Sequence, residues 1–230
     1  MMSSKSSPTY SEEQMADAFE RRLHSQRALV GVGRFSQVFR EVDCHRGRPD
    51  FIGIQTRMHP FRPNSESTHN IGISRILSLL QDHSPRSLAS LIELSHLSRE
   101  VVMRSVRQLV LRRLIKELSP GGRFILSGGA EIFKIKSTAF ELKLKNPRRA
   151  VFQAQQYTLF AQRVWIVVPP SQVTGFDTYR LAMDRWGIGL ATFNPHNHIF
   201  RNIIAAKGGN PVSREHQAYA MLRLVGHAVA

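Results

Sequence analysis

The sequence predicts an α/β protein in which a mixed sheet flanked by helices is interrupted by a separate, mostly helical insert. Outside residues 69–136, segments with helical periodicity alternate with short apolar runs that are typical of strands. Residues 59–70 (HPFRPNSESTHN) contain two prolines and a polar run, which indicate a linker. We therefore divide the chain into a first part of the α/β domain (1–68), the insert (69–136) and a second part (137–230).

The composition excludes several classes of protein. Hydrophobic residues make up 42% of the 230-residue chain, which is enough to bury a core and excludes a disordered protein. No apolar run reaches the roughly 18 residues of a membrane span, and the polar start has no secretory signal, so we expect a cytoplasmic protein without a membrane partner. The single cysteine, Cys44, excludes a disulfide framework and a multi-cysteine zinc site.

The net charge indicates a polyanionic partner. Lys and Arg number 32 against 17 Asp and Glu, which gives a formal charge of +15. The excess lies in residues 69–136, with 11 basic and 5 acidic side chains, and in residues 137–230, with 11 and 4. A positive field spread over two thirds of the chain favours nucleic acid, although it does not distinguish DNA from RNA.

The first part of the α/β domain is expected to form a helix followed by strands. Residues 12–27 carry an apolar stripe at helical spacing, and the apolar run 28–42 predicts extended structure. A turn, His-Arg-Gly-Arg at 45–48, leads into the strand-like run 48–54, RPDFIGI.

The insert is expected to form three helices and a β-hairpin. Its third helix is preceded by Ser98, a good N-cap, and the hairpin turn is Ser-Pro-Gly-Gly. This order of elements resembles a winged helix-turn-helix domain. The predicted helices span 71–81, 87–94 and 99–114, and the predicted strands span 115–118 and 124–127.

The winged-helix resemblance implies that the third helix enters the major groove of DNA. Arg104 and Arg107 lie on the face opposite the apolar stripe of this helix, and Arg and Gln side chains can read base edges or hold phosphates. The same arginines could simply solvate a helix face, and winged helices also dock proteins, so a protein partner stays open. The candidate DNA contacts in the insert are Arg99, Arg104, Arg107, Gln108 and, at the wing tip, Arg123.

The second part of the α/β domain alternates strands and helices. Residues 163–169 (RVWIVVP) form the most strongly strand-like run in the chain. The predicted strands span 138–145, 163–169 and 188–193, and the predicted helices span 147–162, 175–186 and 212–229.

Two half-motifs in adjacent predicted strands identify a family resemblance. Pro49-Asp50 opens one strand, Glu141-Leu142-Lys143 lies within the next, and Gln153 follows in a helix. This arrangement resembles the PD-(D/E)XK nuclease superfamily. The 91 residues from position 50 to position 141 form a long interval, which the insert explains. The predicted fold is therefore a mixed-sheet, restriction-endonuclease-like core with an inserted winged-helix domain.

Phosphodiester hydrolysis explains why these residue types are needed. A divalent ion lowers the pKa of a water and neutralises developing charge, and Mg²⁺ or Mn²⁺ prefers oxygen ligands. We expect Asp50, Glu141 and the Leu142 carbonyl to hold this ion. Positions 141 and 143 share one face of a strand, which brings Lys143 beside the metal-bound water. A surface Asp and an exposed Glu–Lys pair are the alternative, but the apolar neighbours of Glu141 argue against it.

The resemblance implies further site positions with alternatives. Glu12, on the first helix, is the preferred additional carboxylate near the metal, and Glu20 is the second choice. Gln153 is preferred over Gln156 as the glutamine near the active site. Arg148 and Arg149 could hold phosphate, because arginines in the first turn of a helix are unfavourable with its macrodipole.

The sequence thus predicts a metal-dependent DNA endonuclease whose insert grips or selects duplex DNA. The alternative is a non-catalytic DNA-binding regulator, or an accessory protein of a mobile element, on a nuclease-like scaffold. A homodimer would allow both strands to be cut. Tyr219, Leu222 and Val225 form an apolar stripe that could pair two copies or pack on the chain's own sheet.

Overall fold

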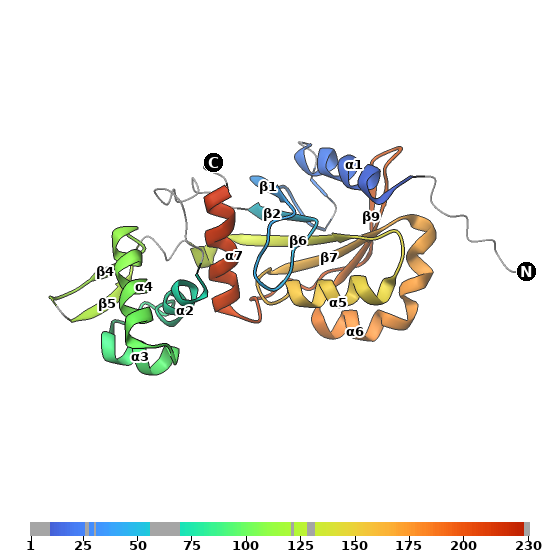
Figure 1. Ribbon diagram of the computed structural model, residues 1–230. Coiled ribbons are helices and arrows are strands. Elements are labelled where there is room, and N and C mark those ends of the chain that lie inside the picture. The colour runs from blue at the N-terminus through green and yellow to red at the C-terminus, as the bar shows by residue number, and fades with distance from the viewer. Residues whose placement is uncertain are drawn as a thin grey trace, which may run out of the picture. The chain divides into compact units, whose positions relative to one another are not determined.

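The computed structural model describes residues 10–25, 28–29, 31–55, 70–120, 122–127 and 132–227, with side chains to residue 224 (Figure 1). The described residues form two compact units. The α/β unit contains those of segments 1–42, 46–55 and 136–211, and the helical unit contains those of segments 43–45, 56–135 and 212–230.

The α/β unit is built on a mixed six-stranded sheet with the order β1-β2-β6-β7-β8-β9. The first three strands are antiparallel, β6, β7 and β8 run parallel, and β9 is antiparallel to β8. The α/β class with a mixed sheet is therefore confirmed. The strands are β1 (Gln37–Arg40), β2 (Phe51–Gln55), β6 (Lys136–Leu142), β7 (Arg163–Val168), β8 (Gly189–Asn194) and β9 (Ile199–Ile204).

Helices cover both faces of this sheet (Figure 1). On one face lies α1 (Glu12–His24), which begins with a capping box between Ser11 and Gln14. On the other lie α5 (Pro147–Tyr157) and α6 (Arg180–Trp186), the latter preceded by a 3₁₀ segment, Pro170–Tyr179. The helix α5 has Pro147 at its first position and Asn146 as its cap, a combination typical of helix starts.

The strand β6 separates two environments because its side chains alternate between the faces of the sheet. Phe140 and Leu142 point to the α1 side, where they join a buried cluster with Phe19. The Phe19 ring lies edge-on to the Phe140 ring, with centroids 5.3 Å apart. Glu141 points to the opposite side, toward α5. The apolar core thus fixes the register that holds Glu141.

The helical unit contains four α-helices and a small antiparallel sheet among its described residues. The sheet order is β3-β5-β4. Ser87 and Ser98 cap the helices that begin at Leu88 and Arg99, because their side chains accept hydrogen bonds from backbone N–H groups. The elements are α2 (Ile71–Leu79), β3 (Arg86–Ser87), α3 (Leu88–Ser95), α4 (Arg99–Leu111), β4 (Ile115–Glu117), β5 (Arg123–Leu126) and α7 (Arg214–His227).

The terminal helix differs most from the sequence-based division, which placed residues 137–230 in the α/β domain. Instead, α7 packs against α2 within the helical unit, and Glu215 pairs with Arg75 at 2.9 Å. Of the stripe expected to pair two copies or to pack on the sheet, Leu222 is buried, and the half-buried Tyr219 ring contacts the His45 ring, with centroids 5.3 Å apart. Val225 lies beyond the described side chains.

Other differences concern strands. Among the described residues of the run 28–42, β1 is the only strand, because Gly31 and Gly33 adopt positive φ and make a turn at an isolated bridge between Leu29 and Gly33. The edge strand β9 and the two-residue strand β3 were not predicted. In the described part of the chain, no helix has the length and apolar character that crossing a membrane requires.

Candidate active site

Asp50 and Glu141 are brought together by the pairing of β2 and β6. Phe51 pairs with Phe140, so Asp50, immediately before β2, stands across from Glu141. The backbone N–H of Leu142 donates a hydrogen bond to Asp50 Oδ2 at 2.6 Å, which fixes the carboxylate at the end of β6. The 91-residue interval from Asp50 to Glu141 is therefore bridged by the register of β2 and β6, as the sequence predicts.

Lys143 completes the cluster. Its Nζ lies 2.9 Å from Glu141 Oε1 and 3.6 Å from Glu12 Oε1. Burial lowers the pKa of Lys143, but the charges of Glu141, Asp50 and Glu12 outweigh burial, and the pKa is raised overall. Lys143 is therefore a fixed cation and not a base at neutral pH.

The surroundings of the Asp50 and Glu141 carboxylates disfavour their ionised forms. Glu141 is only 1% exposed. Burial raises the pKa of Asp50 to about 7, the charge of Glu141 adds to this increase, and the Leu142 N–H and Lys143 oppose it. Burial also raises the pKa of Glu141, against the Tyr157 hydrogen bond and the charge of Lys143. One ammonium group does not compensate both carboxylates, of which Glu141 is buried and Asp50 half-buried, so a further cation would stabilise the site.

Tyr157 on α5 is part of this site and was missed by sequence reasoning. Its hydroxyl donates to Glu141 Oε2 at 2.6 Å and also lies 3.3 Å from the Arg48 carbonyl oxygen. Burial and the adjacent Glu141 charge raise its pKa, so it remains a donor. Tyr157 follows Gln153 by four residues, so both lie on one face of α5. The sequence does not single out Tyr157, because an aromatic residue at helical spacing is usually part of a core.

Gly47 makes room for the Tyr157 ring. Its φ is +138°, and a Cβ atom there would lie 2.7 Å from Tyr157 Cε1. Only glycine combines this backbone conformation with such a close approach. The turn before Asp50 is therefore shaped around the side chain that holds Glu141.

The structure discriminates between the alternatives for the additional site residues. Glu12, at the start of α1, approaches Lys143, whereas Glu20 pairs with Arg40 at 3.0 Å. Gln153 contacts the Tyr157 hydroxyl, and its own Oε1 is buried without a hydrogen-bond partner among the described residues. Gln156 instead lies beside Gly47.

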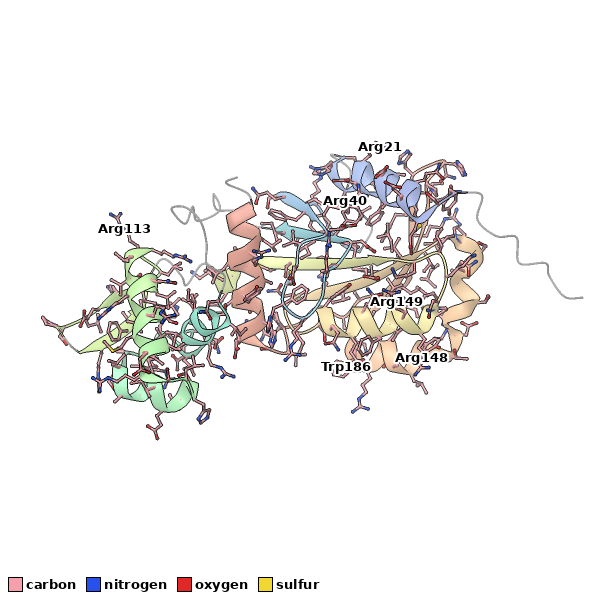
Figure 2. All side chains as sticks on the ribbon, in the orientation of Figure 1. Arg21, Arg40, Arg113, Arg148, Arg149 and Trp186 are labelled. Atoms are coloured by element: carbon pink, nitrogen blue, oxygen red, sulfur yellow. The ribbon has the colours of Figure 1, made fainter. Side chains whose placement is uncertain are left out.

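The expected nucleic-acid contacts lie on the surface of their units. In the helical unit, Gln108 is half-buried and the four arginines are exposed: Arg99, Arg104, Arg107 and Arg123. In the α/β unit, Arg148 and Arg149 are exposed in the first turn of α5 (Figure 2).

The site offers oxygen ligands to a divalent ion. In the part of the chain that the structure describes, no group of three or more His, Cys, Asp or Glu residues is arranged to hold a metal. Mg²⁺, however, keeps several waters and needs only one or two carboxylates. The contact of Lys143 with Glu141 Oε1 is an ion pair without hydrogen-bond alignment, so this buried oxygen has no aligned donor among the described residues. Asp50, Glu141 and the Leu142 carbonyl therefore fit Mg²⁺ or Mn²⁺.

Comparisons of the chain with protein-family models, curated proteins and solved structures give no significant match. The function is therefore inferred from the chemistry of the site.

Proposed function

We propose that this protein is a metal-dependent DNA endonuclease with a PD-(D/E)XK-type active site. The observation that carries the proposal is the pairing of half-buried Asp50 with buried Glu141, with the Lys143 ammonium 2.9 Å from Glu141. Burying two like charges destabilises a fold, so a scaffold without catalytic function would gain nothing from keeping them. This cost argues against the non-catalytic regulator.

Each residue has a defined task in hydrolysis. Asp50, Glu141 and the Leu142 carbonyl would hold Mg²⁺ or Mn²⁺, which supplies an activated water and neutralises charge on the phosphate. Lys143 is already protonated, so it donates hydrogen bonds and stabilises the negative charge that develops on the phosphate oxygens. Tyr157 keeps the Glu141 carboxylate in one orientation, and Gln153 extends this network at the edge of the site.

The direct test is incubation of the protein with plasmid, linear duplex, single-stranded DNA and matched RNA, each with Mg²⁺, Mn²⁺ or EDTA. We expect cleavage of DNA with either ion and none in EDTA. Full activity in EDTA would contradict a metal-dependent reaction, and cleavage of RNA alone would contradict the assignment to DNA.

Tyr157→Phe should reduce cleavage by about 10- to 100-fold, because partners that orient a metal-binding carboxylate have effects of this size. The ring and its packing on Gly47 are retained, so the fold is preserved. Mn²⁺ titration should show weaker binding in this variant. Equal metal affinity in the variant and the wild type would show that the hydroxyl does not position Glu141.

We further propose that the insert is a winged helix-turn-helix domain that binds duplex DNA through α4. Support comes from its order of elements, with the Ser98-capped α4 followed by the β4–β5 hairpin. Arg104 and Arg107 are exposed on α4 opposite the buried Val102 and Leu109. This is the placement that a groove-binding helix needs.

Arg104→Ala with Arg107→Ala should weaken duplex binding and lower its salt dependence. Each lost phosphate contact reduces the slope of log K against log salt by about 0.9. Fluorescence anisotropy at several salt concentrations measures both quantities. Arg21→Ala with Arg201→Ala removes the same charge from exposed positions of the α/β unit and serves as the control. An equal loss in both double variants would point to a diffuse electrostatic effect and against readout by α4.

A further inference from the structure

The layer formed by α5 and α6 exposes large aromatic side chains. Phe152 on α5 is 62% exposed and Trp186 on α6 is 37% exposed. The two helices are in contact and cover the face of the sheet to which Glu141 points (Figure 1). Phe and Trp rings normally contribute to stability by burial, so two exposed rings on neighbouring helices indicate a binding surface.

The α5 part of this layer is strongly basic, whereas α6 carries Arg180, Asp184 and Arg185. Between Glu141 and Asp177 the sequence contains five Lys and Arg residues and no Asp or Glu. Lys145, Arg148 and Arg149 are exposed, and none has an ion-pair partner among the described residues. Figure 2 shows Arg148 and Arg149 on α5 and Trp186 on α6. Exposed rings together with unpaired cations in one layer complement a polyanion that also presents flat rings.

One face of α5 links this surface to the active site. Arg149 precedes Gln153 by four residues, so the two share one face of α5, and Gln153 contacts Tyr157 at the catalytic cluster. Phe152 is adjacent to Gln153 in the sequence, and Arg148 lies one turn before Phe152. Lys145 follows Lys143 by two residues. Phosphates and bases bound here would therefore lead toward Asp50 and Glu141.

We propose that the α5–α6 surface, defined by Phe152, Trp186, Lys145, Arg148 and Arg149, binds single-stranded DNA and guides it to the catalytic cluster. This inference rests on the proposed nuclease function and specifies its substrate. Aromatic side chains stack on unpaired bases while arginines follow the backbone. A duplex hides the faces of its bases, so the rings favour a single strand.

The charge of this surface also favours DNA over a second copy of the chain as its binding partner. A symmetric dimer formed through it would place Arg148 and Arg149 of one copy near those of the other, and like charges repel. Leu181 on α6 is 88% exposed. It is apolar without a π-face, so it serves as a matched control that separates base stacking from general apolar docking.

The test measures binding without catalysis. In the Asp50→Asn background and in EDTA, anisotropy gives the affinity for labelled oligodeoxythymidylate of about 20 nucleotides, for a duplex and for matched RNA. Phe152→Ala and Trp186→Ala should each weaken binding of the single strand by about 5- to 150-fold, the effect of one stacking interaction. Leu181→Ala should leave binding unchanged, and the swaps Phe152→Trp and Trp186→Phe should retain it.

A second readout uses intrinsic fluorescence. Trp165 is 1% exposed, so stacking of bases should quench Trp186 alone, and Trp186→Phe should remove the quenching. Single-strand affinity within two-fold of the parent in the Phe152→Ala/Trp186→Ala protein would overturn the proposal, as would an equal loss in Leu181→Ala. Tighter binding of RNA than of DNA would overturn the assignment to DNA.

Failure of this proposal is distinguishable from failure of the nuclease assignment. If Glu141→Gln abolishes cleavage while the aromatic variants bind single strands normally, the nuclease stands and this surface does not. If the wild type cleaves nothing but the aromatic variants lose binding, the surface stands and the nuclease does not.

Discussion

Glu141→Gln should lower metal-dependent DNA cleavage by at least about 10²- to 10³-fold, the size of effect expected when a charged group that acts on the transition state is removed. Glu141 accepts the Tyr157 hydrogen bond and pairs with Lys143, so the neutral amide removes the proposed metal ligand and the partner of the ammonium together. Initial rates of plasmid nicking with Mn²⁺ measure the loss, and DNA binding in EDTA should persist.

Two glutamates of α1 serve as matched controls for this prediction. Glu20 pairs with Arg40 and does not approach the cluster, so Glu20→Gln should cleave at the wild-type rate. Glu12 lies 3.6 Å from Lys143, so Glu12→Gln should show an intermediate loss. If Glu20→Gln lost as much activity as Glu141→Gln, the assay would be responding to the removal of any acidic side chain and not to this site in particular.

Asp50→Asn should raise the stability of the metal-free protein at pH 8. Burial and the charge of Glu141 raise the pKa of Asp50 from 3.8 to about 7 in the folded state. Ionisation of Asp50 at pH 8 therefore costs the folded state roughly 2–4 kcal/mol, at 1.36 kcal/mol per pKa unit with a reduction for partial exposure. The neutral amide avoids this cost, and the melting temperature should rise by roughly 5–15 °C in EDTA.

The pH dependence of this difference follows from the sign of the shift. Between pH 4 and pH 7 the folded state binds more protons at Asp50 than the unfolded state does, so the wild type gains stability as the pH falls. The advantage of Asp50→Asn should therefore shrink from pH 8 to pH 5. Saturating Mg²⁺ should stabilise only the wild type, because the ion binds the folded site. A variant less stable than the wild type in EDTA at pH 8 would show that Asp50 is not destabilised by its surroundings.

Hydrophobic periodicity accounts for most of the fold that the sequence predicts. The buried runs in β2, β6, β7 and β8, and the capped amphipathic helices α1, α4 and α5, follow from local patterns. The strand β9 was missed because its hydrophobic pattern does not follow its burial: Ile199 and Ile203 are exposed while Asn202 is half-buried, and a turn-rich segment precedes the strand. Whether α7 covers the sheet or another element depends on tertiary contacts, which periodicity alone does not specify.

The candidate site was predicted in part. Placing Asp50, Glu141 and Lys143 together depended on a resemblance between two short half-motifs, because local pattern cannot show that positions 50 and 141 are neighbours across strands. No motif marks Tyr157 in the sequence. Only the partner of its hydroxyl group distinguishes it from a tyrosine that is simply part of the core. That partner, Glu141, comes from another element.

The most direct test of the central claim is the rate of plasmid nicking by wild-type and Glu141→Gln proteins, prepared in parallel, over a titration of Mn²⁺. We expect the wild-type rate to rise from background in EDTA to saturation, while the variant stays near background throughout. Equal rates for the two proteins, or a wild-type rate in EDTA as high as that at saturating Mn²⁺, would contradict a metal-dependent nuclease centred on Asp50, Glu141 and Lys143.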